Sequence, residues 1–369
     1  MLGRPTSVGL AALLAAAGVL LARTPCEAIP DFAHRYGVTC QACHTIVPRL
    51  NAFGEKFEAA GYRWPATVRT DAAFPVTMKS NLAYSSAAST LPKYIVDEVE
   101  FLVMGSAGNH WTYRVEQYAV DGGVPGSTRD AYVQYFGDAA SAWHDGGRAA
   151  FDVKAGQFTL PLPNDPETQR PTENHYALYD QTVGANPFNF FDDRIGVDAH
   201  LSVRGAELSL LAMKGHDPQS GLPTQGTDTM ASVRAGTDAL SLYAYRYDGT
   251  RPLGPVADAF ERTGIGIKSI TGKSRATLVL QTGRDSSSDG FGLGAASSGG
   301  YVQEEWAFSD RFIGVARYDG TSAPGSFLRS TTGALIFRIA SRARLTVEDV
   351  VTHSPSTANT INAALLFAY

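Results

Sequence analysis

Residues 111–116 read Trp111-Thr112-Tyr113-Arg114-Val115-Glu116, with apolar and polar side chains in strict alternation. A β-strand turns successive side chains to opposite faces, so this pattern predicts a strand with one apolar and one polar face. The same alternation returns at residues 275–281 and 342–347. Such strands fit either a soluble antiparallel sandwich or a transmembrane barrel with a wet lumen and a lipid-facing outside.

The number of alternating segments favours the barrel. Sixteen such segments occur, and an even number is typical of bacterial barrels. They begin near Pro75, Val99, Trp111, Asp130, Phe151, Gly196, Ala206, Thr229, Leu240, Arg262, Ser274, Tyr301, Arg311, Thr331, Arg342 and Thr360. The predicted fold is therefore mainly β: a 16-stranded transmembrane antiparallel barrel over residues 66–369.

The links between segments show a second regularity. Links after odd-numbered segments tend to be long and links after even-numbered segments short, as expected for a barrel with loops on one rim and turns on the other. Long links are 160–194, 216–226 and 285–300, and short links are 204–205, 271–272 and 309–310. The stretch 137–148 is an exception to this rule. Residues 361–369 alternate up to a terminal Tyr369, which resembles the signal that outer-membrane barrels present for assembly.

The link 160–194 allows two interpretations. It could fold inward and narrow the lumen, offering hard oxygen ligands to a divalent metal, or it could be a solvated surface loop whose acids bind nothing. Its acidic and aromatic residues are Asp165, Glu167, Glu173, Asp180, Asp192, Asp193, Phe188, Phe190 and Phe191. The Ser- and Gly-rich link 285–300 is predicted to be a flexible linker.

The first residues are typical of a secretory signal peptide. A short positive start is followed by the apolar stretch 8–22, and small residues flank a cleavage position before Ile29. The apolar stretch is short for a membrane anchor, which is the alternative. Cleavage would remove residues 1–28, including Cys26, and would change the net charge from −5 to −6, because two arginines and one glutamate are lost. A mildly acidic chain is a poor candidate for nucleic-acid binding.

The two remaining cysteines lie in Cys40-Gln41-Ala42-Cys43-His44. This is the attachment pattern of a c-type haem, in which both thiols bind the porphyrin covalently and the following histidine is an axial ligand of the iron. A disulfide, a redox dithiol or a zinc site are the alternatives, and zinc would need another ligand such as His34. The sequence predicts one covalent haem, held by Cys40, Cys43 and His44.

An apolar helical face follows the motif. Leu50, Phe53, Phe57 and Ala60 recur at helical spacing, Asn51 can cap the start, and Gly61 can end the helix. Phe53 and Phe57 are therefore candidates for packing on the haem, although any apolar surface would suit them.

The predicted haem domain, residues 29–65, is too small to form a stable hydrophobic core of its own, so we expect it to pack against a larger structure. The barrel lumen, with Arg114, Glu116, Arg275 and Arg344 turned inward, is the predicted site. The sixth iron ligand is open among His34, Met78 and Met104, and a methionine would raise the potential relative to a second histidine.

The head of the mature chain resembles the fused cytochrome-porins of bacterial outer membranes. The resemblance rests on residues 28–33, Tyr36-Gly37, the haem motif, Thr45, Pro48-Arg49-Leu50, Phe53-Gly54, Phe57 and Gly61-Tyr62. The chain departs from that family in carrying His34 where Arg or a similar residue is expected.

The resemblance implies electron transfer across the outer membrane, with the haem domain at the periplasmic side or inside the lumen. The expected donor is extracellular Fe(II), which makes ferrous-iron oxidase activity a possibility, and the expected acceptor is a periplasmic c-type cytochrome or another periplasmic carrier. Outward electron transfer, or a passive porin with a structural haem, are the alternatives.

Overall fold

The computed structural model describes residues 31–63, 76–87, 93–137, 149–166, 169–214, 227–253 and 255–368. The predicted signal peptide and the predicted boundary near residue 65 lie outside these ranges. No helix in these ranges is long and apolar enough to cross a membrane.

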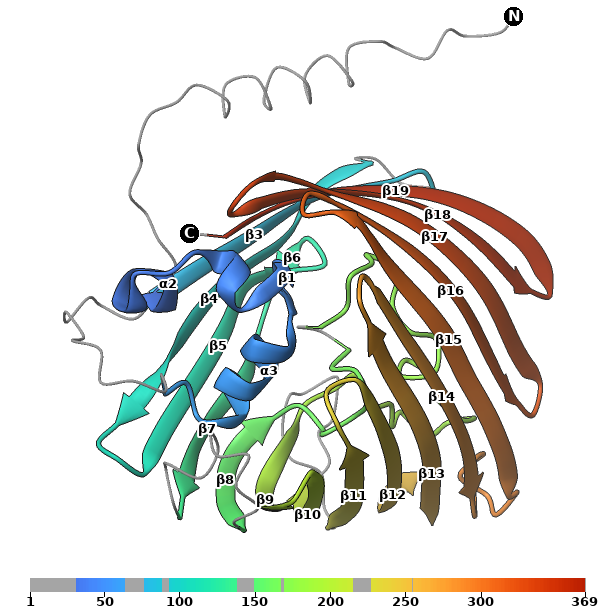
Figure 1. Ribbon diagram of the computed structural model, residues 1–369. Coiled ribbons are helices and arrows are strands. Elements are labelled where there is room, and N and C mark those ends of the chain that lie inside the picture. Colours follow the sequence, from blue (N-terminus) through green and yellow to red (C-terminus); the bar gives the residue numbers. More distant parts are fainter. Residues whose placement is uncertain are drawn as a thin grey trace, which may run out of the picture.

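The predicted barrel is confirmed. Sixteen long antiparallel strands form one closed sheet, in which the last strand pairs with the first (Figure 1). They are β3 (Val76–Ser85), β4 (Tyr94–Ala107), β5 (Trp111–Asp121), β7 (Thr128–Phe136), β8 (Ala150–Phe158), β9 (Arg194–Val203), β10 (Ala206–Lys214), β11 (Asp228–Gly236), β12 (Leu240–Leu253), β13 (Val256–Thr271), β14 (Ser274–Asp285), β15 (Ala295–Ser309), β16 (Phe312–Ala323), β17 (Ser326–Ala340), β18 (Ala343–Ser354) and β19 (Ser356–Ala368). The two-residue β6 (Val124–Pro125) pairs with β5 on the way to β7.

The barrel is apolar outside and polar inside. Along β5, Trp111 is 49% exposed, whereas Arg114 and Glu116 are 6% and 1% exposed. Leu280 and Leu335 are about half exposed in the same way on the opposite wall. Exposed apolar side chains and buried charged ones suit a barrel in lipid with a polar interior, and they exclude the soluble sandwich.

The two rims differ as the link lengths predict, with exceptions. One rim, here the turn rim, carries short links such as 204–205, 272–273 and 341–342. The other, the loop rim, carries the 35-residue link 159–193 between β8 and β9. The rule of long odd-numbered links is wrong for β12–β13, β16–β17 and β18–β19, because these strand pairs run on as long hairpins with almost no loop between them.

Ahead of the barrel lies a small folded unit, residues 31–63, here the N-terminal segment. It comprises the helix α2 (Asp31–Tyr36), the 3-10 turn η1 (Cys40–Ala42), the strands β1 (His44–Ile46) and β2 (Arg49–Leu50), and the helix α3 (Ala52–Ala59). Asn51 caps α3 by accepting a hydrogen bond from the Gly54 N–H at 2.9 Å. Gly61, with φ +66°, follows the helix in the left-handed conformation. Both helix signals are confirmed.

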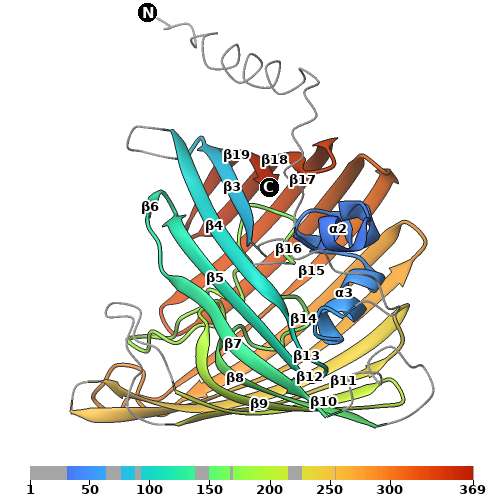
Figure 2. The same cartoon turned by 90° about the vertical axis from the view of Figure 1, so that its left-hand side faces the viewer.

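The N-terminal segment contacts the inner wall of the barrel near the turn rim (Figure 2). Buried ion pairs join Arg49 to Glu305 on β15 at 2.8 Å and Glu55 to Lys268 on β13 at 2.7 Å. Apolar contact is added by Ile46, which is buried with Ile313, Val315, Ala334 and Ile336 of the wall. The segment thus buries side chains against the barrel that it has no room to bury within itself.

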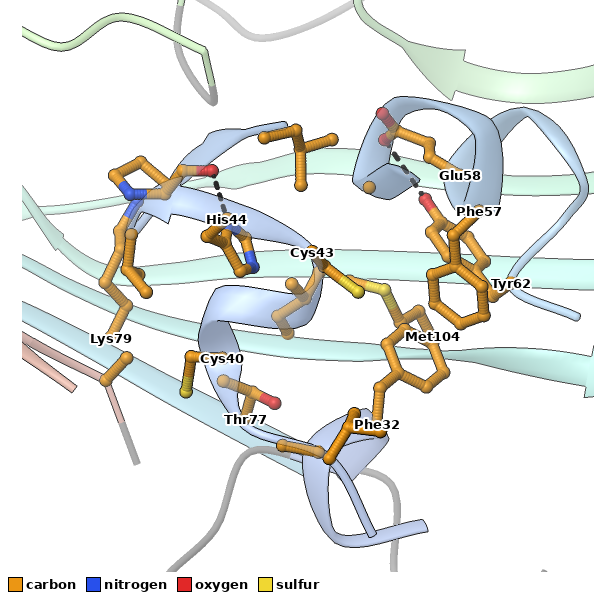
Figure 3. Close-up of a pocket in the computed structure, with 18 of the residues that line it drawn as sticks. Phe32, Cys40, Cys43, His44, Phe57, Glu58, Tyr62, Thr77, Lys79 and Met104 are labelled. Carbon is orange, nitrogen blue, oxygen red and sulfur yellow. Dashed lines mark hydrogen bonds between the residues drawn. The ribbon is translucent and has the colours of Figure 1, made fainter. Parts of the chain in front are cut away.

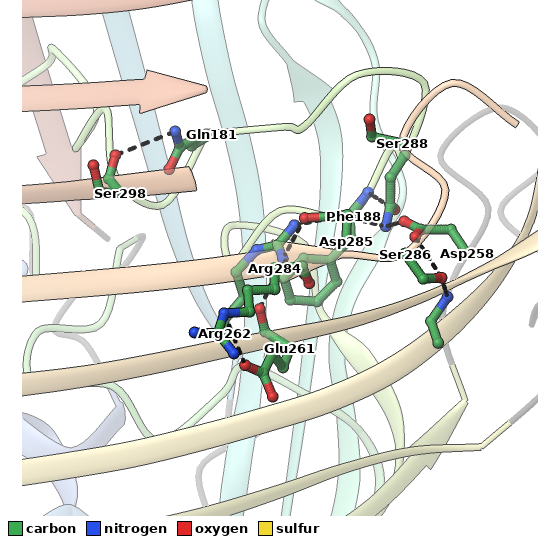
Figure 4. Close-up of polar contacts among 12 residues, drawn as sticks. Gln181, Phe188, Asp258, Glu261, Arg262, Arg284, Asp285, Ser286, Ser288 and Ser298 are labelled. Carbon is green, nitrogen blue, oxygen red and sulfur yellow. Dashed lines mark hydrogen bonds and ion pairs between the residues drawn. The ribbon is translucent and has the colours of Figure 1, made fainter. Parts of the chain in front are cut away.

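Residues 159–193 fold into the lumen, so the inward interpretation of this link is right and the solvated surface loop is wrong. The link adds Leu160, Leu162, Leu178, Tyr179, Phe188 and Phe190 to a core shared with wall residues. Its far end is fixed by Asn186, whose side-chain amide donates to Asp258 and Asp285 at 2.8 and 3.2 Å. Figure 4 shows Arg262 and Asp285 beside Phe188 in this anchor.

Candidate functional site

A cavity opens between the N-terminal segment and the wall strands β3, β4 and β5, near the end of β19 (Figure 3). Its empty volume, including the open space at its mouth, is about 1210 Å³. The segment contributes Phe32, Ala33, Val38, Thr39, Cys40, Cys43, His44, Val47, Pro48, Leu50, Gly54, Phe57, Glu58 and Tyr62. The barrel contributes Thr77, Lys79, Glu100, Leu102, Met104, Arg114 and Ala368.

Both thiols of the predicted haem motif line this cavity, and neither is in a disulfide. Cys40 begins the turn η1, and Cys43 follows that turn. The turn is held by Asn51, whose side-chain amide donates to the carbonyls of Gln41 and Ala42, each at 3.1 Å. Burial raises the pKa of both thiols, that of Cys43 to about 11, so the folded segment holds them as neutral thiols.

The imidazole ring of His44 is oriented by a hydrogen bond at one of its two nitrogens. Its Nδ1 donates to the Pro48 carbonyl at 2.9 Å, which fixes the tautomer and leaves Nε2 as the unprotonated, metal-binding nitrogen. Burial lowers the pKa of the imidazole, which keeps the ring neutral. A neutral imidazole with its Nδ1 tied to a backbone carbonyl is the usual state of a metal ligand.

A close backbone approach sets the shape of the cavity floor. At Gly54, a Cβ atom would lie 2.1 Å from the carbonyl oxygen of Cys43 and 3.0 Å from a methyl group of Leu50. The same Cys43 carbonyl accepts the Asn51 N–H at 2.9 Å. The helix α3 can therefore lie directly on the haem motif only because position 54 has no side chain.

One side of the cavity is aromatic. Phe57, only 4% exposed, meets Phe32 edge to face at 5.0 Å between ring centroids, and Phe32 stacks on Tyr62 at 5.3 Å. Of the two phenylalanines predicted for haem packing, Phe57 lines the cavity, whereas Phe53 does not and stacks on Phe57 from behind at 6.4 Å.

The sixth-ligand candidates differ in where they lie. Met104 on β4 lines the cavity, and in Figure 3 its side chain points into it beside Cys43. Met78 lies between the cavity-lining Thr77 and Lys79 on β3, so it points to the outer face of the barrel. His34 is in α2, but its side chain is outside the described part of the chain.

Charged groups gather at the barrel side of the cavity. Lys79 is paired with Glu100, and Arg114 is paired with Glu116 at 2.6 Å and with Glu58 of the N-terminal segment at 3.2 Å. Burial raises the pKa of Glu58, and Arg114 offsets only part of this effect. The apolar cavity thus has one polar wall, as a ligand with an apolar body and charged substituents requires.

The acidic residues of the inward link do not form a metal site in the described ranges. No group of three His, Cys, Asp or Glu side chains is placed to hold a metal ion there. Glu173 accepts from Asn81 at 2.9 Å and pairs with Arg344 at 3.6 Å, and Asp180 pairs with His175. These carboxylates help to fix the link to the wall and to itself.

Two residues that position the site were assigned no role from sequence. Arg49 and Gly54 belong to the stretch that resembles the cytochrome-porin head, but nothing local shows that Arg49 pairs with a wall carboxylate. Gly54 carried one usable signal, since a glycine in the first turn of a helix costs stability unless a close contact requires it.

Comparison with known proteins identifies the fold. No family model and no curated protein matches the chain. Solved structures do match: the anion-selective porin from Comamonas acidovorans (TM-score 0.60, 10% identity, 80% of this chain and 98% of that one) and Salmonella typhi OmpF in complex with daunomycin (0.59, 10%, 80% and 97%). The outer membrane channel DcaP of Acinetobacter baumannii matches similarly (0.56, 11%, 80% and 96%). The barrel therefore has the fold of outer-membrane porins.

Proposed function

We propose that this chain is a bacterial outer-membrane barrel that carries one covalently bound c-type haem in its N-terminal segment and transfers electrons. The observation that carries the proposal is the cavity that Cys40, Cys43 and His44 share, with the Nδ1 of His44 bonded to the Pro48 carbonyl. Two free thiols for attachment and a neutral imidazole for iron are the groups that a c-type haem needs, and an apolar, partly aromatic lining suits the faces of a porphyrin.

The residues that would hold the haem come from both parts of the chain. Cys40 and Cys43 would form the thioether bonds, and His44, together with Met104, would bind the iron. A haem held there would supply one-electron redox chemistry. The protein excludes water with Phe32, Phe57 and Tyr62, and the Pro48 carbonyl keeps the imidazole oriented.

The rims give the direction across the membrane. In outer-membrane barrels the short turns face the periplasm, which supports placing the turn rim, and the cavity near it, on that side. We propose that electrons from an extracellular donor, Fe(II) being the first candidate, reach a periplasmic carrier through this site. Electron flow in the opposite direction uses the same residues.

Covalent attachment tests the proposal. C40A and C43A should each lose normal attachment, and the double variant should lose all peroxidase staining on a denaturing gel. H44A should keep some stained haem but shift the Soret band and midpoint potential, because the thioethers remain while an axial bond is lost. A double cysteine variant that stains as strongly as the unchanged protein would refute the assignment.

The second candidate is a passive porin in which the haem only stabilises the N-terminal segment. This candidate is favoured by the similarity of the barrel to porins, one of which is described as anion-selective. Single-channel conductance in planar bilayers separates the two: a passive porin conducts with the segment in place, whereas the proposed electron-transfer barrel should conduct appreciably only after residues 31–63 are deleted.

A further inference from the structure

Four basic residues form an arc on the turn rim beside the mouth of the cavity. This basic arc consists of Lys273, Arg311, Arg338 and Arg342. Backbone hydrogen bonds tie its members to neighbouring turns and strand ends: Ala307 N–H to the Lys273 carbonyl at 2.9 Å, Arg338 N–H to the Arg311 carbonyl at 2.8 Å, and Ala368 N–H to the Arg342 carbonyl at 2.9 Å. The arc is therefore continuous along this part of the rim.

The arc reaches the haem motif itself. Ala368, bonded to Arg342, lines the cavity, and Gln41 within the motif donates to the Ser341 carbonyl at 3.4 Å. Arg342 and Arg338 are also close enough to Cys40 for their charges to act on its thiol. A partner that touches the arc would thus lie at the edge of the cavity nearest Cys40.

The described part of the chain offers the arc few acids. None of its four side chains forms an ion pair with a residue in the described ranges, whereas the lumen cations Arg49, Arg114 and Arg317 are all paired. Asp310 is the acid within the arc, and Asp238 on the next turn is already paired with Lys56 at 2.9 Å. A local excess of positive charge in a chain of net charge −5 marks a specific surface.

The direction of the side chains favours a protein over lipid. Arg338 shares a face of β17 with Ile336, which is buried and points inward, whereas Leu335 and Phe337 occupy the lipid-facing positions of that strand. Arg342 lies in the turn that follows β17. Lys273 and Arg311 stand exposed at the tips of their turns. The arc thus faces the aqueous space below the cavity rather than the headgroups around the barrel.

We propose that the basic arc is the docking surface for an acidic, soluble one-electron carrier protein. This inference rests on the proposed function and adds the surface at which the haem would exchange electrons with a partner protein. One electron passes between the haem and the docked carrier, so that one is oxidised and the other reduced, and no group is transferred. Complementary charge would steer the carrier to the cavity edge and raise the association rate.

The experiment measures binding to the full haem-loaded chain in zwitterionic nanodiscs by biolayer interferometry. The probes are one strongly acidic and one strongly basic soluble c-type cytochrome, at low and high salt. The test variant combines K273Q, R311Q, R338Q and R342Q, and the control is R284Q, an 83% exposed arginine on the loop rim. The smaller variant K273Q/R311Q, confined to exposed turns, serves if the fourfold variant does not fold.

At low salt the acidic probe should associate about tenfold more slowly with the fourfold variant than with the unchanged chain or R284Q, and high salt should erase the difference. The K273Q/R311Q variant should also associate more slowly with the acidic probe, by a smaller factor than the fourfold variant. Equal association of the fourfold variant and unchanged chain with the acidic probe, or equal effects on both probes, would overturn the proposal.

Binding does not require haem, so the two proposals fail separately. A chain without peroxidase-staining haem would overturn the proposed function, whatever it binds. A haem-loaded chain without charge-dependent binding would overturn the docking surface alone.

Discussion

Replacing Arg49 by methionine should release the N-terminal segment from the wall. The Arg49 side chain is fully buried, and its guanidinium makes two contacts with Glu305, Nη2–Oε1 at 2.8 Å and Nε–Oε2 at 3.3 Å. Nη1 also donates to the backbone and side-chain oxygens of Gln169 at 3.0 and 3.2 Å. One side chain thus joins the segment, the strand β15 and the inward link.

The magnitude follows from the charge left behind. R49M leaves Glu305 with a hydrogen bond from Gln303 at 3.0 Å but no cation at that distance. Removing one partner of a buried pair costs about 3–5 kcal/mol. A loss of about 3 kcal/mol shifts the docking equilibrium by a factor of roughly one hundred.

Limited proteolysis of the segment in the detergent-solubilised chain measures this shift. When opening is fast, the cleavage rate follows the population of the open state, so R49M should be cut about a hundredfold faster. The control is K56Q, because the Lys56–Asp238 pair is 42% and 48% exposed and such pairs contribute about 0–1 kcal/mol. R49M/E305Q should recover part of the protection, since no buried charge is left unpaired. Unchanged protection in R49M, or an equal effect of K56Q, would refute this reasoning.

Three further outcomes are expected. M104L should lower the midpoint potential in a potentiometric titration, because a methionine ligand raises it; an unchanged potential would remove Met104 from the iron. G54A should destabilise the N-terminal segment by about 1–3 kcal/mol, seen as faster proteolysis, because its Cβ would meet the Cys43 carbonyl; equal protection would show that the backbone can yield. Burial raises the pKa of Glu55, but Lys268 and a neighbouring arginine outweigh it and the net shift is downward. Its contribution to docking is therefore present above the ordinary glutamate pKa and lost as pH falls below about 4, and E55Q should abolish this part of the acid sensitivity of docking.

The inward course of residues 159–193 shows why the acidic link allowed two interpretations from sequence. Its carboxylates are typical of both a surface loop and a lumen loop. The composition of the link does not show which residues the carboxylates contact, and those contacts decide between the two. The deciding contacts are made to residues more than seventy positions away, such as Asn186 to Asp258 and Glu173 N–H to Glu348. The three hairpins of the loop rim where long links were predicted have a similar explanation. The length of a strand beyond the apolar band is set by its pairing with the neighbouring strand, which the sequence pattern does not show.

The sequence by itself determined the sixteen strands, the inside-out polarity of the wall, the capped helix after Asn51 and the motif Cys40-Gln41-Ala42-Cys43-His44. These features are local, since strand alternation, helix capping and motif spacing are set within about ten residues. Only the tertiary structure decided that Met104 and not Met78 lines the cavity, that Arg49 meets Glu305, and that the basic arc lies beside Cys40. Those relations depend on which strands become neighbours when the barrel closes. A pattern of period two shows which face of a strand a side chain lies on, but it carries no information about which residues of distant segments lie close together.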